Sequence, residues 1–301
     1  MGLFSRSGRA RVSLTPNAVR PRQPVTATIT TDKPLDKVRS ATLEWGYTNF
    51  YRYHWAGRAD SAAAAANDSL AMIGEVGTNY GGERDTDDWV CVDRVPVAIE
   101  AGEFTGTSAT FKVPSWAPGS SPELARWSCR LVVDRGGRDV DEHGVFDVVI
   151  GRDDVQVVDE PQERTGGDGR TSLDIVLPTL LFGAGETVNG QLVLTPQQDM
   201  SDGELSIYWA RRQISHPVER APALGGSAKS GQTIKLGKGI PLRSGVPVTV
   251  PFAVPLPGDA PPSGEAVHSS LEWFLEATLM YSKWTQGIEK VCRPIMVVNA
   301  P

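Results

Sequence analysis

Histidines are the side chains in this sequence best suited to acid–base or metal chemistry. The four of them, His54, His143, His216 and His268, lie in different segments, and none has a second ligand at the spacing of a zinc site. His268 precedes Ser269, so it could act as a base beside a hydroxyl nucleophile, but no glycine-flanked serine of the nucleophile-elbow type accompanies it. We therefore expect His268 to be a loop histidine at the start of a strand, and we expect no metal site.

Acidic and glycine-rich clusters are the other candidates for chemistry. The carboxylates at 87–88, 139–142 and 153–154 fall in expected turns, and the run from Asp139 to Gly144 matches a calcium loop only weakly, so we interpret it as a solvated hairpin end. The glycine-rich segment 225–231 lacks the Gly-Lys-Ser/Thr that a phosphate-binding loop requires. Because no catalytic constellation is present, we expect a protein that is not an enzyme and that binds no cofactor.

A stripe of aromatic residues is the strongest candidate for binding. These residues share one parity along an expected strand or hairpin, so their side chains would line one face: Trp45, Tyr47, Tyr51, Tyr53 and Trp55. Packing in a sandwich core is one interpretation. The other is an exposed stripe for a partner, since Tyr and Trp are favoured at interfaces and Arg52 lies beside them. The candidate partner-binding residues are Trp45, Tyr47, Tyr51, Arg52, Tyr53 and Trp55.

The elements that would position these residues occur twice along the chain. The first half reads Pro16–Thr30, Leu43–Trp45, Phe111–Pro114 and Trp127–Val133; the second half reads Pro178–Leu194, Ile207–Trp209, Phe252–Pro255 and Trp273–Leu279. In each half, turn residues precede runs of Val, Ile, Leu and Thr of strand length, so the repeated unit is a small all-β domain. Residues 271–281 could form a helix by propensity, but their place in the repeat predicts a strand.

The spacing of the repeat predicts the domain limits. We expect an N-terminal β-sandwich over 1–158, a charged and glycine-rich linker over 159–170, and a C-terminal β-sandwich over 171–301. The first half is longer between its Trp and Phe markers, which indicates an insertion near 58–85. An alanine run at 62–66 follows Asp60 and Ser61, so a short helix is expected in this insertion.

Composition excludes several classes of protein. The chain has 301 residues, 40% of them hydrophobic, and a net charge of -6, which argues against a general nucleic-acid binder. No stretch is long and apolar enough to span a membrane, and the arginine-rich start has no apolar region of the secretory type. For residues 3–11 we expect at most a weak contact with an anionic lipid surface. The three cysteines are widely spaced, so we expect free thiols and a cytoplasmic location.

The motif in the second half resembles a known family. The segment from Val250 to Ser263 contains a Phe-x-hydrophobic-Pro strand and a proline-rich corner ending in Pro-Ser, and an aromatic-rich strand follows at 270–279. This pattern is similar to that of arrestin-like domains, and within that fold it is most similar to the bacterial sporulation-control proteins of the stage 0 type. The resemblance implies two tandem immunoglobulin-like β-sandwiches. The basic residues by which some arrestins sense phosphate cannot be matched here, so phosphate sensing is not implied.

Two functions follow as expectations. The first is a non-enzymatic, cytoplasmic arrestin-like scaffold or regulator that binds unidentified protein partners, in sporulation, development or stress control. Strand addition at sheet edges would be one way to bind such partners. The alternative is a β-sandwich binding module that recognises carbohydrate or a lipid surface through the aromatic stripe.

Overall fold

We describe a computed structural model, which places residues 9–55, 82–136, 139–216, 223–224 and 226–299. Over these residues the chain is all-β, as the sequence predicts. The only helical elements in these ranges are the 3-10 turns η2 (Arg152–Asp154) and η3 (Trp284–Gln286), and no described helix could cross a membrane. The helix expected near 58–85 falls mainly on residues 56–81, which lie outside the described residues.

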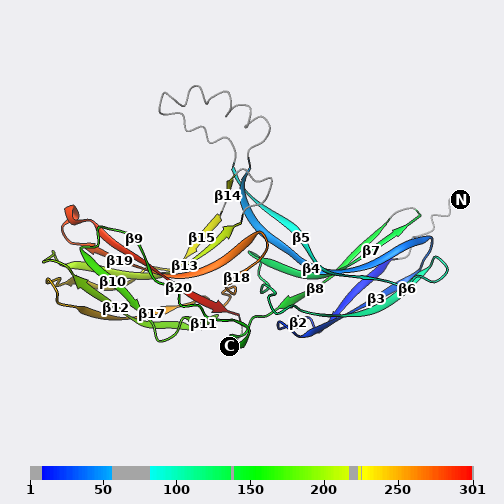
Figure 1. Cartoon of the computed structure of the whole chain (residues 1–301), viewed down its shortest axis with the longest axis horizontal. Coiled ribbons are helices and arrows are strands. Elements are labelled where there is room, and N and C mark those ends of the chain that lie inside the picture. The colour runs from blue at the N-terminus through cyan, green and yellow to red at the C-terminus, as the bar shows by residue number, and fades with distance from the viewer. Residues whose placement is uncertain (1–8, 56–81, 137–138, 217–222, 225, 300–301) are drawn as a thin grey trace, which may run out of the picture. The chain divides into compact units, whose positions relative to one another are not determined.

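The chain forms two compact units (Figure 1). Unit 1 comprises residues 1–51, 85–150 and 265–269, and unit 2 comprises residues 52–84, 151–264 and 270–301. The domain limits expected at 158 and 171 stay a prediction. Within the expected linker 159–170, however, β9 (Glu163–Gly166) pairs with β20 (Ile288–Val298), so this stretch contains a strand.

Unit 1 contains a three-stranded antiparallel sheet and a larger sheet. The small sheet has the order β1-β3-β6, with β1 (Ala10–Thr15), β3 (Pro24–Leu35) and β6 (Phe104–Lys112). The larger sheet has the order β5-β4-β7-β8-β2, with β2 (Ala18–Val19), β4 (Val38–Trp55), β5 (Gly82–Pro96), β7 (Ala125–Arg135) and β8 (Val140–Val148). β2 runs parallel to β8, whereas β4, β7 and β8 are antiparallel. The far end of β4, which belongs to unit 2, pairs with β14 (Ala223–Leu224).

Unit 2 repeats this plan. Its small antiparallel sheet has the order β10-β12-β17, with β10 (Thr171–Val176), β12 (Thr187–Pro196) and β17 (Val248–Pro255). Its larger sheet has the order β11-β20-β19-β13-β15, with β11 (Leu181–Gly183), β13 (Gly203–Ser215), β15 (Gly226–Ser230) and β19 (Ser269–Tyr281). β16 (Ile234–Ile240) also pairs with β13, and β18 (Gly264–Glu265) pairs with β19. β11 runs parallel to β20, as β2 does to β8.

Alternation along the strands produces the core of each unit. In β10, Leu173 and Ile175 are buried while their neighbours are more exposed, the pattern of a strand with one face on a core. β19 follows the same rule, since Leu275, Ala277 and Leu279 are fully buried. The strand predicted over 271–281 is therefore confirmed.

Trp127 and Trp273, which occupy matching positions in the repeat, make the same kind of hydrogen bond in the two units. The indole N–H of Trp127 donates to the carbonyl of Pro118 at 2.8 Å, and that of Trp273 donates to the carbonyl of Pro261 at 3.0 Å. In each case the serine two residues after the proline binds the last strand of its unit by both main chain and side chain, Ser120 to Val148 and Ser263 to Val297. The Pro-x-Ser corner is therefore a common device that joins one edge of each sandwich to its final strand.

Candidate partner-binding surfaces

The aromatic stripe is divided between the core and residues whose side chains are not described. Trp45, Tyr47 and Tyr51 are 0%, 1% and 6% exposed. Trp45 stacks on Phe111 with ring centroids 5.1 Å apart, and Tyr47 lies 4.9 Å from Trp127. Burial also raises the pKa of the Tyr47 phenol. These three side chains pack in the interior of unit 1, so they do not form the exposed stripe.

The other members of the predicted stripe lie in unit 2. Arg52 is half-buried, and its main-chain N–H donates to the hydroxyl of Ser215 at 2.9 Å. Tyr53 pairs with Leu224 along the backbone, while the side chains of Tyr53 and Trp55 lie outside the described residues. Partner binding by Arg52, Tyr53 and Trp55 therefore stays a prediction.

The serine beside His268 holds structure together. In unit 1, the hydroxyl of Ser269 donates to the carbonyl of Phe50 at 2.7 Å and accepts from the side-chain amide of Asn49 at 2.9 Å. Asn49 is fully buried and also accepts from the main-chain N–H of His268 at 2.7 Å. The ring of His268 faces Asp88, with Nε2 3.7 Å from the carboxylate. Sequence reasoning missed Asn49, because a polar residue in a strand gives no sign of partners more than two hundred positions away.

No described group of three His, Cys, Asp or Glu side chains is placed to hold a metal ion.

On the outer face of the larger sheet in unit 1, Arg130 lies 3.7 Å above the ring of Trp89, and Arg126 lies 5.3 Å from that of Phe50. Asp87 and Asp141 line the same hollow of about 520 Å³. Two guanidinium groups and two carboxylates balance there, so the hollow presents no net charge to a ligand.

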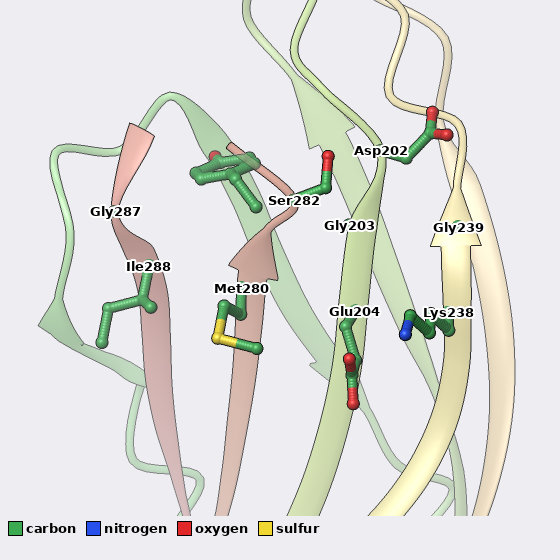
Figure 2. Close-up of a pocket in the computed structure, with 10 residues that line it drawn as sticks. Asp202, Gly203, Glu204, Lys238, Gly239, Met280, Ser282, Gly287 and Ile288 are labelled. Carbon is green, nitrogen blue, oxygen red and sulfur yellow. The ribbon is translucent and has the colours of Figure 1, made fainter. Parts of the chain in front are cut away.

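A more apolar groove lies on unit 2, across strands β16, β13, β19 and β20. Figure 2 shows Met280 and Ile288 on adjacent strands, with Glu204 and Lys238 on the neighbouring pair. The groove has a volume of about 530 Å³. Both side chains face away from the core: Met280 is 49% exposed and Ile288 is 37% exposed. Two adjacent apolar side chains on the solvent face of a sheet are therefore available for contact.

The strand register explains this groove. Met280 pairs with Ile288 at the end of the β19–β20 ladder, and Glu204 pairs with Lys238 between β13 and β16. Glu204 forms an ion pair with Lys235 at 3.3 Å, which leaves the exposed Lys238 ammonium at the rim. Gly287, with a φ of +79°, turns the chain from η3 into β20 and so places Ile288 beside Met280. The sequence predicts a strand at Met280, within 271–281, but gives no prediction for Ile288.

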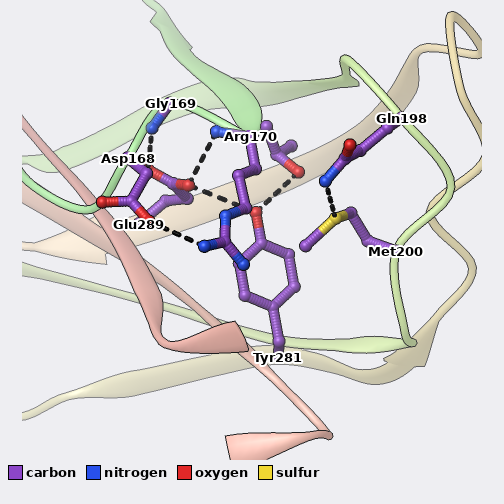
Figure 3. A network of polar contacts seen from close by, with 8 residues as sticks. Asp168, Gly169, Arg170, Gln198, Met200, Tyr281 and Glu289 are labelled. Carbon is purple, nitrogen blue, oxygen red and sulfur yellow. Dashed lines mark hydrogen bonds and ion pairs between the residues drawn. The ribbon is translucent and has the colours of Figure 1, made fainter. Parts of the chain in front are cut away.

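A polar network in unit 2 surrounds the buried carboxylate of Glu289, which is 2% exposed (Figure 3). Its oxygens accept from the main-chain N–H of Gly169 at 3.0 Å and of Arg170 at 2.9 Å, and the phenol of Tyr281 lies 3.3 Å away. The Tyr281 oxygen is also 2.8 Å from the Thr171 hydroxyl. These contacts join the loop before β10 to β20, so we interpret the network as structural.

The three thiols differ in their surroundings, which leads to a prediction. Cys91 is exposed, whereas Cys129 and Cys292 are buried. Burial raises the pKa of Cys129 to about 12, and burial is also the largest cause that raises the pKa of Cys292 to about 11. Both therefore remain protonated thiols at pH 8.

In native protein at pH 8 we expect an aromatic disulfide reagent to titrate one thiol per chain, and three after unfolding. The Cys91→Ser variant should titrate none while folded; rapid reaction of a second thiol would contradict the burial.

Comparison with known proteins finds matches among solved structures. No family model and no curated protein matches the chain. A solved structure that matches is the sporulation control protein Spo0M from Bacillus subtilis, at 18% sequence identity and a TM-score of 0.35. The match covers 44% of this chain and 51% of Spo0M, so it spans about half of that protein. The described residues of this chain are all-β, and the chain is similar to this sporulation control protein over the part that matches.

Proposed function

We propose that this chain is a non-enzymatic regulatory scaffold of the arrestin-like type, which binds a protein partner through the groove at Met280 and Ile288. The observation that supports this proposal is the pair of exposed apolar side chains inside a groove of about 530 Å³. A cytoplasmic location and a role in sporulation, development or stress control belong to the same proposal and rest on the sequence resemblance.

The partner segment that fits this groove carries an apolar side chain. Such a side chain would cover Met280 and Ile288, and each 100 Å² of apolar surface removed from water contributes about 2.5 kcal/mol. Methionine adapts to different shapes, because its side chain is unbranched and flexible. Asp202 and Lys238 at the rim offer opposite charges that would orient the segment. Tyr281, an aromatic residue at the groove, has its ring in the core, so it offers no exposed face on which a sugar could stack.

Site-specific photo-crosslinking tests the proposal. A benzophenone amino acid in place of Met280 should crosslink to a defined protein in extracts of the source cells, while the same group in place of Val246, another exposed residue of unit 2, should not. With that protein purified, we expect Met280→Lys and Ile288→Lys to weaken binding at least about tenfold, as expected for charges placed in an apolar contact. Val246→Lys should bind like the wild type.

Two outcomes would decide against this function. Equal crosslinking from positions 280 and 246 would show that the groove has no specific partner. Binding to a glycan array or to anionic liposomes that Met280→Lys abolishes would assign the groove to the alternative, a carbohydrate or lipid module. Melting curves of the lysine variants should match that of the wild type, because both side chains already lie at the surface.

A further inference from the structure

Met280 differs in its surroundings from the other described methionines. It is 49% exposed on the solvent face of β19, whereas Met200 is 8% exposed and Met296 is half-buried. The sulfur of Met200 accepts a hydrogen bond from the side-chain amide of Gln198 at 3.6 Å (Figure 3). Within the described ranges, no donor is placed on the sulfur of Met280. A small oxidant in solution therefore reaches Met280 first.

The strand register determines which side chains lie beside Met280. The main-chain N–H of Ser282 donates to the carbonyl of Asp202 at 2.8 Å where the neighbouring strands β19 and β13 meet. Two positions further into each strand, Met280 and Glu204 lie opposite each other. Ile288 pairs with Met280 on its other side, and Figure 2 shows the thioether between these two side chains. Ile288 has no polar atom and an ionised carboxylate only accepts hydrogen bonds, so neither neighbour can donate to an oxygen placed on the sulfur.

We propose that Met280 is a reversible oxidation site that controls partner binding in the groove, with hydrogen peroxide as the oxidant. This inference rests on the function proposed above. In the reaction, a lone pair of the sulfur attacks one peroxide oxygen and the O–O bond breaks. The sulfur loses two electrons and gains a bond to that oxygen, while the other oxygen leaves as water with both protons. The product is methionine sulfoxide.

Sulfoxide formation changes the chemistry of the groove surface. The thioether is apolar and flexible, whereas the sulfoxide is polar and carries an acceptor oxygen. An apolar side chain of the partner that covers Met280 would bury this oxygen between Ile288 and Glu204. Burying a polar group without a hydrogen bond is unfavourable. The oxidised groove therefore binds an apolar segment more weakly than the unoxidised groove does.

The place of Met280 at the surface makes its oxidation repairable. Methionine sulfoxide reductases return the sulfoxide to the thioether; the oxygen leaves as water and two thiols become a disulfide. These enzymes can reach a side chain at the end of the β19–β20 ladder. Because the Met280 side chain lies outside the core, its oxidation should leave the melting temperature unchanged, in contrast to oxidation of the buried Met200.

Peptide mapping after graded peroxide treatment tests the site. The protein carries Cys91→Ser, which removes the exposed thiol, and mass spectrometry follows the gain of one oxygen at each methionine. In the folded protein we expect Met280 to be oxidised at least about tenfold faster than Met200, and faster than Met296, because reaction follows exposure. In denaturant the three rates should be equal. Equal rates in the folded protein would overturn the proposal.

Binding measurements test the regulation. Once crosslinking at position 280 has identified the partner, the chain is oxidised, the peroxide is removed, and the partner is added. Oxidised wild type should bind at least about fivefold more weakly than before treatment, and both types of methionine sulfoxide reductase with a dithiol should restore the affinity. Each variant is compared with itself before and after peroxide. Met280→Leu should show no change, and Met296→Leu, the matched control, should show the change of the wild type.

The outcomes separate the regulation from the function. Unchanged affinity with Met280 fully oxidised would overturn the regulation and leave the proposed function standing. A loss of affinity after peroxide in Met280→Leu equal to that of the wild type would also overturn it, because another residue would then be responsible. An unoxidised protein that binds no partner would overturn both the function and its regulation, although the order of the oxidation rates would be the same.

Discussion

Gly46→Val is expected to unfold unit 1 or to detach β5 from its sheet. A side chain at position 46 would begin with a Cβ 2.0 Å from the carbonyl oxygen of Val90 and 3.1 Å from the Cα of Cys91. Both obstacles are backbone atoms, so no side-chain rotation relieves the overlap. Overpacking that side chains can partly absorb already costs roughly 1–3 kcal/mol. We therefore expect Gly46→Val to cost more than about 4 kcal/mol, a value reached by few single substitutions.

Chemical denaturation of the full chain measures this effect. Hydrogen exchange at the amides of β4 and β7 reports on unit 1, whereas tryptophan fluorescence follows both units, because Trp45 and Trp127 are buried in unit 1 and Trp273 in unit 2. Gly258→Ala is the matched control: it lies in an exposed turn of unit 2 with no neighbouring atom within 4 Å of the added Cβ and with no positive φ. That variant should be neutral or more stable by up to about 1 kcal/mol. A Gly46→Val protein with a wild-type transition would show that β5 does not pass over Gly46.

The repeat made the fold predictable, because its marker residues perform the same task in both units. Trp127 and Trp273 are both buried, and each donates to the carbonyl of the proline that begins its Pro-x-Ser corner. Prolines within a strand are confined to sheet edges and corners, and β17, which contains Pro251 and Pro255, is the edge of its sheet. The positions of the prolines and the alternation of side chains were sufficient to predict these strands and corners.

The sites were less predictable, because alternation shows that a strand has two faces without showing which face is buried. The same period predicted an exposed stripe or a core for Trp45 and Tyr47, and only the packing against Phe111 and Trp127 decides for the core. Met280 lies in a strand that the sequence predicts, but its exposure follows only from its pairing with Ile288 on the solvent face of the sheet. Asn49 and Glu289 depend on partners distant in sequence, which no local pattern encodes.

Glu289→Ala is expected to be the most damaging polar substitution in unit 2. The carboxylate is 2% exposed and accepts from two main-chain N–H groups, those of Gly169 and Arg170, with the Tyr281 phenol nearby (Figure 3). The loop follows the carboxylate so closely that a Cβ at Gly167 would lie 2.1 Å from its Oε2. Truncation to alanine leaves both N–H groups without their acceptor. Each buried donor left unsatisfied costs roughly 1–3 kcal/mol.

We therefore expect Glu289→Ala to lower the free energy of unfolding of unit 2 by about 3–5 kcal/mol, the range seen when one partner of a buried charged network is removed. Glu289→Gln keeps one acceptor oxygen and places an N–H₂ group against the other main-chain donor, so it should recover only part of this loss. Asp259→Ala, at an exposed turn of the same unit, is the matched control and should change stability by less than about 0.5 kcal/mol.

Hydrogen exchange locates the effect of Glu289→Ala. The amides of Gly169 and Arg170 should lose protection in this variant before the amides of β19 do, because β19 is anchored by the core around Trp273. Retained protection at these two amides would show that another acceptor, and not Glu289, holds the loop.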